Sequence, residues 1–263
     1  MRIPLFQVDA FTSRVFGGNP AAVALLDSWL PDAALQAIAE ENNLAETAFV
    51  VRGSAGWELR WFTPKTEVDL CGHATLAAAD VLFSHAEPAE NGHLIEFATR
   101  SGALRVRRDA DGLVMDFPAR PPRPVRAPPA LLESLAIAPR EVLAADDYFV
   151  VYDREHEIRE LAPDFALLSR CDLRGVICTA PGDEVDFVSR FFAPRVGIDE
   201  DAVTGSAHTS LTPYWAARLG KQALTARQLS VRGGALWCEN AGERVRIKGQ
   251  AALYMKGEIE LDD

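Results

Sequence analysis

The chain has 263 residues, of which 48% are hydrophobic and 25% charged, and its formal net charge is −11. The composition is that of a globular protein, and the acidic balance argues against nucleic acids or anionic membranes as partners, because both bind basic surfaces. No apolar run approaches the ~18 residues of a membrane-spanning helix. The first residues enter a strand-like pattern without a signal-peptide core, so we expect a cytoplasmic protein.

In the first half, a helix is expected over 31–42, with Pro31 in its first turn and its apolar residues on one face. A second, Ala-rich helix is expected to begin near Gly72. Segments with the alternation or composition of strands are 21–26, 47–51, 57–62, 94–99, 104–108 and 113–117. The last two of these strands are joined by Asp109-Ala110-Asp111-Gly112, which is typical of a hairpin turn.

Six prolines lie within 118–129, which excludes a helix there and makes this segment the best candidate for a linker. Beyond it, helices are expected over 130–137, 158–169 and 206–219, and Pro213 predicts a kink or a late start in the third. Further strands are expected at 141–152, 176–179, 185–192, 228–232, 235–239, 244–248 and 251–261. Many strands with few helices favour two β-rich α+β lobes over a doubly wound sheet, and no Gly-rich nucleotide motif occurs.

Two segments half a chain length apart resemble one another. Trp61-Phe62-Thr63-Pro64-Lys65 precedes Cys71-Gly72-His73-Ala74, and Phe191-Phe192-Ala193-Pro194-Arg195 precedes Thr204-Gly205-Ser206-Ala207. Each copy has an aromatic strand, a proline, an acidic loop, a small-Gly-small turn and then a helix. Two such units facing each other would place two helix N-termini across one cleft, where exposed amides bind anions. The repeat therefore predicts lobes of 1–117 and 121–263 and a site for a small carboxylate.

Glu46 is the strongest candidate for acid–base chemistry. It is the only charged residue between the end of the first helix and an apolar strand. A carboxylate in apolar surroundings holds its proton more tightly than one in water, which is a property that a general acid or base needs. A strand-edge carboxylate in water is the equally weighted alternative.

The other polar residues near the two glycine turns are weaker candidates. His73 follows Gly72, but a histidine satisfied by a local hydrogen bond is the more common reading of such a position. Asp201 closes the acidic run before the second turn, and Ser206 is also consistent with a simple helix N-cap. His208 lies one turn further on and is a weak candidate. No serine occupies a nucleophile elbow, so a Ser-His-Asp triad is excluded.

The four cysteines, Cys71, Cys171, Cys178 and Cys238, form no CxxC pair and indicate neither a disulfide framework nor a metal site. The spacing of Cys71-Gly72-His73 is too tight for a usual zinc pair. Cys171, Cys178 and Cys238 are expected to be buried and inert.

Four motifs together resemble the PhzF-like family, the relatives of a phenazine-biosynthesis isomerase. These motifs are Phe16-Gly17-Gly18-Asn19-Pro20-Ala21-Ala22-Val23, Asn43-Leu44-Ala45-Glu46-Thr47-Ala48-Phe49, Asp69-Leu70-Cys71-Gly72-His73-Ala74-Thr75 and Glu200-Asp201-Ala202-Val203-Thr204-Gly205-Ser206-Ala207. The resemblance covers essentially the whole chain. It implies a fold like that of diaminopimelate epimerase: an α+β protein of two similar lobes, each a β-barrel-like mixed sheet around a central helix.

The resemblance also implies the chemistry. Glu46 would carry the proton, and His73, Asp201 and Ser206 would assist it. The substrate would contact Asn19, Gly72, Ala74, Thr204, Gly205 and Ala207. No metal and no organic cofactor would be required, and the protein would be a homodimer acting on a small carboxylate, with neither nucleic acid nor membrane as partner.

One departure from the epimerases of this fold bears on the mechanism. Those racemases need two thiols, and this chain has Cys71 in the first turn but Thr204 in the second. A threonine hydroxyl is far too weak an acid to replace a thiol near neutral pH. We therefore expect a cofactor-independent isomerase that moves a proton with a single carboxylate. The alternatives are a one-base epimerase or lyase on a related acid, and a non-catalytic binding or scaffold member of the family.

Overall fold

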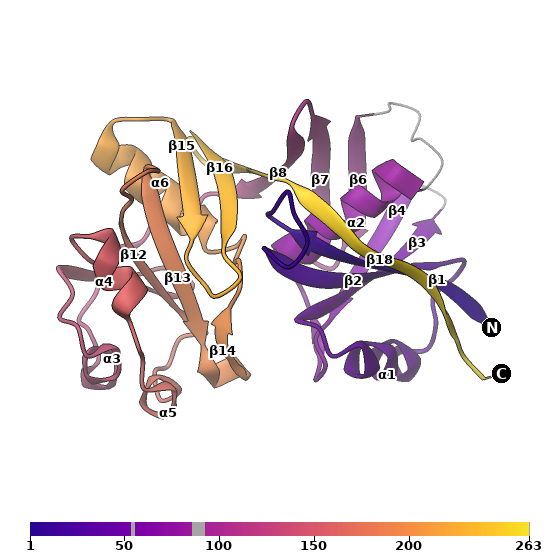
Figure 1. The fold of residues 1–263 in the computed structure, drawn as a ribbon, viewed down its shortest axis with the longest axis horizontal. Coiled ribbons are helices and arrows are strands. Elements are labelled where there is room, and N and C mark those ends of the chain that lie inside the picture. Colours follow the sequence, from indigo (N-terminus) through magenta and orange to yellow (C-terminus); the bar gives the residue numbers. More distant parts are fainter. Residues whose placement is uncertain (54–55, 86–92, 263) are drawn as a thin grey trace. The chain divides into compact units, whose positions relative to one another are not determined.

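The computed structural model describes residues 1–53, 56–85 and 93–262. The chain forms two compact units: Met1–Asp116 together with Lys248–Asp263, and Phe117–Ile247. In the first unit, the late strand β18 (Ala251–Glu260) pairs antiparallel with β1 (Arg2–Ala10) along its whole length; the two lie side by side in yellow and indigo (Figure 1). The predicted lobe of 121–263 therefore differs from the structure at its end, because β18 joins the sheet of the first unit.

The sheet of the first unit is mixed. Its strands are β1, β18, β2 (Asn19–Leu26), β3 (Glu46–Gly53), β4 (Gly56–Phe62), β5 (Glu67–Val68), β6 (Leu94–Thr99), β7 (Gly102–Asp109) and β8 (Gly112–Pro118). The strands β2 and β3 run parallel, with the helix α1 (Asp32–Asn42) as their crossover, and β6 runs parallel to β4. The other pairs are antiparallel. The strand β1 lies between β18 and β2, the strand β4 pairs with both β3 and β5, and the strand β7 lies between β6 and β8.

Two helices cover the two faces of this sheet. Leu35, Ile38 and Ala39 of α1 pack against Leu5 and Phe49 and their neighbours. The helix α2 (Gly72–His85) contacts β1, β2 and β3, and its residues from Gly72 to Ala79 are all buried. A helix that is apolar all round must be enclosed by the rest of the domain. The first unit is thus a curved sheet around a central helix, which confirms the predicted fold class.

The second unit repeats the plan. Its strands are β9 (Arg123–Pro124), β10 (Glu141–Ala144), β11 (Tyr148–Val151), β12 (Val176–Pro181), β13 (Phe187–Ala193), β14 (Ile198–Asp201), β15 (Ala223–Gln228), β16 (Gly234–Ala241) and β17 (Arg244–Gly249). The strands β11 and β12 run parallel, β12 and β13 antiparallel, and β13 and β15 parallel. The strands β2, β3, β4 and β6 of the first unit follow the same sequence of directions.

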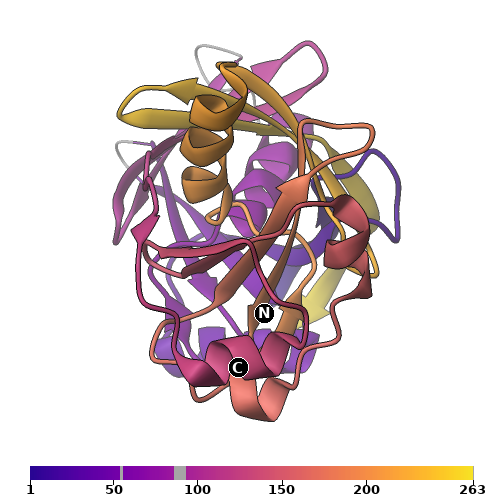
Figure 2. The ribbon, with the colours of Figure 1, turned by 90° about the vertical axis from the view of Figure 1, so that its left-hand side faces the viewer.

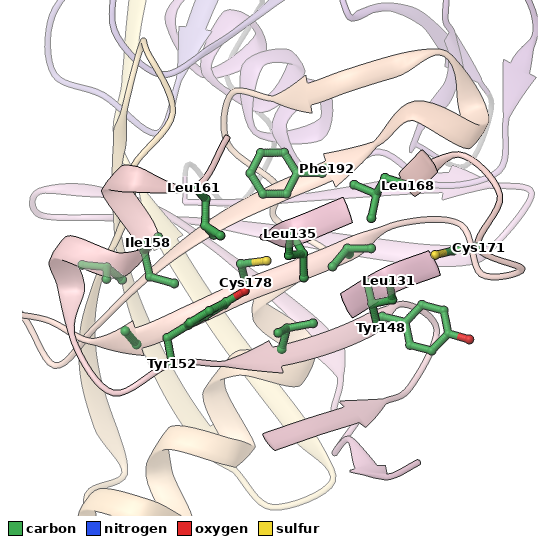
Figure 3. Close-up of a cluster of buried hydrophobic side chains, with 14 residues drawn as sticks. Leu131, Leu135, Tyr148, Tyr152, Ile158, Leu161, Leu168, Cys171, Cys178 and Phe192 are labelled. Atoms are coloured by element: carbon green, nitrogen blue, oxygen red, sulfur yellow. The ribbon is translucent and has the colours of Figure 1, made fainter. Parts of the chain in front are cut away.

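The helices α3 (Pro129–Leu135), α4 (Glu155–Glu160) and α5 (Phe165–Leu168) cover one face of this second sheet. Their side chains Leu131, Ile158 and Leu168 belong to a cluster that includes Tyr152 and Phe192 (Figure 3). Figure 2 shows the gold α6 (His208–Leu219) well apart from the pink and red α3 to α5.

The helix α6 packs on the opposite face of that sheet. Trp215 Nε1 donates to Thr179 Oγ1 over 3.0 Å, and the Trp215 ring stacks on Phe187. The second sheet is therefore also buried on both faces.

Three predicted elements differ from the structure. The helix expected over 158–169 is broken into α4 and α5, because Pro163 cannot donate a backbone hydrogen bond and Asp164 caps a new turn by accepting from Leu167 N. The strand expected over 228–232 ends at Gln228, where Ser230 accepts from Gly233 N in a turn. The strand expected over 141–152 is the hairpin of β10 and β11. Within the described ranges, no helix has the length and apolar composition needed to cross a membrane.

Candidate functional site

Three segments of the first unit bring polar side chains to one place. Asn19 begins β2, Glu46 begins the parallel strand β3, and His73 lies in the first turn of α2. The tight turn before Asn19 depends on Gly18, which has φ +62° and where a Cβ would lie 2.0 Å from the carbonyl oxygen of Ala10. The local sequence thus fixes the position from which Asn19 reaches the site.

The imidazole of His73 lies between the other two side chains. Its Nε2 is 3.0 Å from Glu46 Oε2, and Asn19 Nδ2 donates to its Nδ1 over 3.1 Å. The Cys71 Sγ is 3.5 Å from the same Nδ1. Only 5% of His73 and 1% of Asn19 are exposed. Glu46 Oε2 is buried without a hydrogen-bond partner, so its contact with His73 is a charge contact of poor hydrogen-bond alignment.

Charge and burial act in opposite directions on His73. Burial, the largest single influence, lowers its pKa, but the Cys71 sulfur and the Glu46 carboxylate together raise the pKa well above the usual value. Burial and the Glu46 charge raise the pKa of the Cys71 thiol, against the opposing effect of His73. Burial of the Cys71 thiol thus favours its protonated form.

The Asn19 amide can form a hydrogen bond with either protonation state of His73. As oriented, its amide nitrogen donates to Nδ1, which places the ring proton on Nε2, facing Glu46. An amide turned over would present its oxygen to a protonated Nδ1, and the hydrogen-bond network decides between the two orientations. Asn19 was expected among the substrate contacts, and in the structure its side chain contacts His73.

The turn before α6 in the second unit is held by a buried glutamine. Gln228 Oε1 accepts from Thr204 N over 2.8 Å, and its Nε2 donates to Asp201 O and Thr204 Oγ1 over 2.8 and 3.1 Å. Thr204 Oγ1 in turn donates to Asp201 Oδ2 over 2.6 Å. These bonds hold Asp201 close to the second glycine turn.

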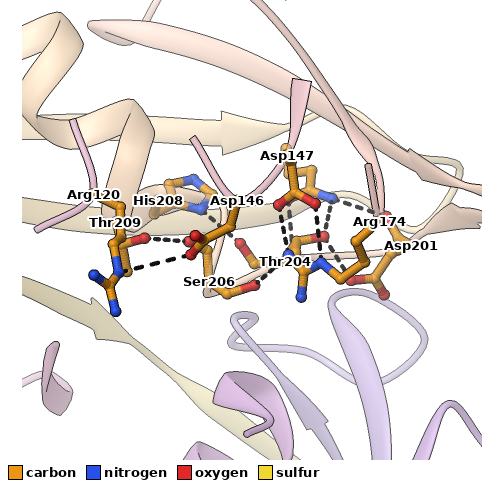
Figure 4. Close-up of polar contacts among 10 residues, drawn as sticks. Arg120, Asp146, Asp147, Arg174, Asp201, Thr204, Ser206, His208 and Thr209 are labelled. Carbon is orange, nitrogen blue, oxygen red and sulfur yellow. Dashed lines mark hydrogen bonds and ion pairs between the residues drawn. The ribbon is translucent and has the colours of Figure 1, made fainter. Parts of the chain in front are cut away.

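A guanidinium also reaches this turn. Arg174 Nε and Nη2 donate to the two carboxylate oxygens of Asp147 over 3.0 and 2.6 Å, and Nη2 donates to Ser206 Oγ over 3.3 Å (Figure 4). The Arg174 guanidinium lies 5.4 Å from the centre of the Phe191 ring. Asp147 is buried, whereas the Arg174 side chain is 46% exposed. A buried carboxylate thus fixes a half-exposed cation beside Ser206.

Neither Arg174 nor Asp147 was expected from the sequence, and the strand registers of the internal repeat show why. In the first unit, Thr47 lies opposite Phe62, and in the second Val176 lies opposite Phe192. Gly175 of the second unit therefore corresponds in position to Glu46 of the first.

The same registers relate the partner strands. Ala21 lies opposite Glu46, and Tyr148 lies opposite Val176, so Asp147 has the place of Ala21. Because Gly72 corresponds to Gly205, Ser206 has the place of His73. In each unit a charged side chain at or just before the start of a strand, Glu46 or Arg174, contacts the residue that follows the turn glycine.

The remaining candidates lie close to these two groups. Gly72, Ala74, Thr204, Gly205 and Ala207 are all buried parts of the two turns. The helix α6 begins at His208, three residues after Gly205. The second glycine turn therefore lies before its helix, whereas Gly72 is the first residue of α2. Pro213 stays inside this helix, so the later start does not remove it from the helical segment.

His208, a weak candidate by sequence, is fully buried. Its Nδ1 lies 2.9 Å from Thr204 O, and its Nε2 has no partner. Burial lowers its pKa to about 4. The cysteines Cys171, Cys178 and Cys238 are buried free thiols, as expected.

Among the residues that the structure describes, one set of side chains could hold a metal ion. Atoms of Glu46, Cys71 and His73 that can act as ligands all lie within 4.8 Å of one another. The two-residue spacing of Cys71 and His73 suggested no such group, but the turn into α2 directs both side chains toward Glu46. The sequence missed this grouping because the third ligand comes from another strand.

Comparison with known proteins gives consistent matches along the chain. The family model described as phenazine biosynthesis-like protein matches residues 8–257. An uncharacterized isomerase of Pseudomonas aeruginosa is 59% identical, over 99% of this chain and 100% of its own length. The crystal structure of a PhzF-family phenazine biosynthesis protein from Enterococcus faecalis matches with a TM-score of 0.96 and 47% identity, covering 99% of this chain and 100% of that one.

The likeness in fold reaches further than the likeness in sequence. A hydroxyproline epimerase from Agrobacterium vitis matches with a TM-score of 0.64 over 100% of this chain and 93% of its own, at 11% identity. At that identity the match concerns the fold alone.

Proposed function

Because the chain belongs to the phenazine biosynthesis-like family, whose relatives include proteins named as isomerases, we propose that it is a cofactor-independent isomerase of a small carboxylate. Glu46 takes a proton from a carbon next to an unsaturated or carbonyl-bearing carbon. The electron pair delocalises into the neighbouring π system, and Glu46 returns the proton at another position. No bond to the enzyme forms, and nothing is oxidised or reduced.

The single observation that carries this proposal is the state of the Glu46 carboxylate. Its Oε2 is buried, has no hydrogen-bond partner and lies 3.0 Å from a histidine with a raised pKa. The His73 ring faces the carboxylate oxygen that accepts the proton in this proposal. His73 thereby supports Glu46 as the base, and Asn19 sets the orientation of the ring.

The second unit supplies hydrogen-bond donors in this proposal. Ser206 Oγ accepts from Arg174, which leaves the hydroxyl proton of Ser206 to donate to an oxygen of the substrate where negative charge develops. Asp201 assists from the same turn in this proposal.

The bonds of Thr204 favour one base over two. Its hydroxyl donates to Asp201 and accepts from Gln228, so it is engaged within its own unit. Cys71, in the matching turn, has a raised pKa. A one-base epimerase or lyase acting through Glu46 is the second candidate. The homodimer and the cytoplasmic location expected from the sequence stay predictions.

Proton exchange in deuterated water tests the proposal. Native mass spectrometry of the purified protein first identifies any acid that copurifies. That acid, with a panel of small unsaturated, keto and α-amino acids, is then followed by proton NMR in D2O. We expect enzyme-dependent exchange at carbon, and Glu46→Gln should lower it roughly 10²–10⁴-fold, because an amide keeps the shape but cannot cycle a proton.

The matched control is Glu40→Gln, which makes the same change at an exposed position of α1. Wild-type exchange by Glu46→Gln would overturn the assigned role of Glu46. The absence of exchange with every acid, including a copurified one, would instead favour the non-catalytic alternative.

A further inference from the structure

We propose that Glu46, Cys71 and His73 form a binding site for a thiophilic divalent metal ion, with Zn²⁺ as the natural case, and that the ion inhibits the enzyme reversibly. The metal site is inferred from the first unit alone. Only its inhibitory effect rests on the proposed function, because the ion would occupy the Glu46 oxygen that carries the proton.

The three ligands are of the types that zinc prefers. Structural and catalytic zinc ions are bound by cysteine sulfur, histidine nitrogen and carboxylate oxygen, and catalytic sites have three protein ligands with a fourth position open. Here His73 Nε2 is 3.0 Å from Glu46 Oε2 and 4.0 Å from Cys71 Sγ. In a tetrahedral site with bonds of 2.0–2.3 Å, neighbouring ligand atoms are about 3.3–3.6 Å apart. The Glu46–His73 pair is close to this spacing, whereas Cys71 Sγ, which lies 3.5 Å from Nδ1, must move toward Nε2 to share an ion with it.

A second observation points to a ligand at the same place. Glu46 Oε2 is a buried atom without a hydrogen-bond partner, although buried carboxylate oxygens are normally satisfied. It faces the His73 ring rather than solvent. A metal ion would provide the missing partner.

The other nitrogen of His73 already has the support that metal-bound histidines need. Such a histidine donates its second N–H to a fixed acceptor, which orients the ring. Asn19 occupies that position at Nδ1, 3.1 Å away, and its amide oxygen becomes the acceptor when the amide is turned over. Asn19 is thus a positioning residue for the metal.

Binding of the metal ion releases two protons. The ion replaces the thiol proton of Cys71 and the Nε2 proton of His73, and both protons go to solvent. The resulting thiolate and the Glu46 carboxylate neutralise the two positive charges.

Cobalt(II) is a spectroscopic probe of this site that needs no substrate. Metal-free full-length protein is titrated with Co²⁺, and the absorption spectrum is recorded. We expect one equivalent to give a sulfur-to-cobalt charge-transfer band and the visible bands of tetrahedral cobalt, and Zn²⁺ to abolish both. Cys71→Ser should remove the charge-transfer band, whereas the control Cys171→Ala, a buried cysteine of the second unit, should retain it.

Further variants test the other ligands. His73→Gln and Glu46→Gln should each weaken cobalt binding, and Asn19→Leu should weaken it roughly 10–100-fold, as loss of an outer partner typically does. Circular dichroism checks that each variant is folded. A charge-transfer band that survives Cys71→Ser, or no band at millimolar cobalt, would overturn the metal site.

The inhibitory effect is measured separately. Zn²⁺ should stop the proton exchange of the wild type, and a chelator should restore it. Exchange that persists when zinc saturates the cobalt site would overturn the inhibition while leaving the site itself intact. If no acid is exchanged at all, the proposed function fails, and the cobalt titration still decides the metal site.

Discussion

The guanidinium of Arg174 contacts both carboxylate oxygens of Asp147 and, through Nη2, the hydroxyl of Ser206. A bidentate pair of this kind fixes the plane of the guanidinium as well as its place. Ser206 therefore has a defined hydrogen-bond donor on one side, and its own proton is directed away from that donor.

We predict that Arg174→Met lowers proton exchange roughly 10- to 100-fold, because a hydrogen bond from a charged donor contributes about 1.5–3 kcal/mol. Arg174→Lys should recover only part of the loss, since lysine cannot make the bidentate contact. In the Ser206→Ala background, Arg174→Met should cost little more, because both changes remove one interaction. Exchange rates measured by NMR test this, with Arg227→Met as an exposed control. Fully additive losses would show that Arg174 acts independently of Ser206.

Cys71→Ala should lower proton exchange far less than Glu46→Gln does. The raised pKa of the Cys71 thiol leaves it protonated near neutral pH, and the partner thiol of a two-base racemase is replaced by Thr204. The two variants are compared in the same NMR assay. If Cys71→Ala, or alkylation of Cys71 alone, silences the enzyme while Glu46→Gln does not, the thiol is the base.

His208 should make the folded state less stable in acid. Burial lowers its pKa to about 4 in the folded protein, against 6.5 for the exposed side chain. Between these values the unfolded chain binds a proton that the folded chain excludes, so stability falls as pH decreases from about 6.5 to about 4. The shift corresponds to about 3 kcal/mol of unfolding free energy.

The measurement for His208 is urea unfolding as a function of pH. In His208→Gln, which does not titrate, this part of the acid sensitivity should be absent, while the variant has a lower stability at pH 7 from altered packing. The same pH dependence in both proteins would assign the acid sensitivity to other groups.

Gly175→Ala should destabilise the second unit by about 1–3 kcal/mol through overpacking. A Cβ at Gly175 would lie 2.4 Å from Cζ of the buried Phe191 ring, on which the Arg174 guanidinium stacks. Gly257→Ala, where a Cβ meets only Met255 Sδ at 3.4 Å, is the matched change in a strand of the first unit. Equal unfolding midpoints in denaturant for the two variants would show that the Phe191 ring can move aside.

The sequence alone predicted most of the fold, because its signals are local. Pro31 and the apolar face of 31–42 predicted α1, and the Ala-rich run after Gly72 predicted the enclosed α2. The elements that were misjudged depend on single interactions. The break between α4 and α5 depends on Pro163 and the cap at Asp164, and the end of β15 depends on the turn at Ser230. The return of β18 to β1 is a long-range pairing that no local pattern specifies.

The candidate site was predictable where its residues lie in motifs. Glu46 and His73 were expected, and the structure brings them together. Asp201 and Ser206 lie close to the second turn, but their roles stay predictions. Arg174 was missed because it belongs to no motif and reaches Ser206 only through the strand register and the clamp of Asp147.

The pairing of β1 with β18 also bears on the order in which the protein assembles during synthesis. Residues 117–247 leave the ribosome as one uninterrupted stretch and contain the whole of the second unit. The first unit begins with the earliest residues, and β1 can pair with β2 early, but its other edge has no partner until residues 251–260 have emerged. The unit encoded first is thus the one completed last, and until then the nascent chain carries an open strand edge, which is the kind of edge on which misassembly begins.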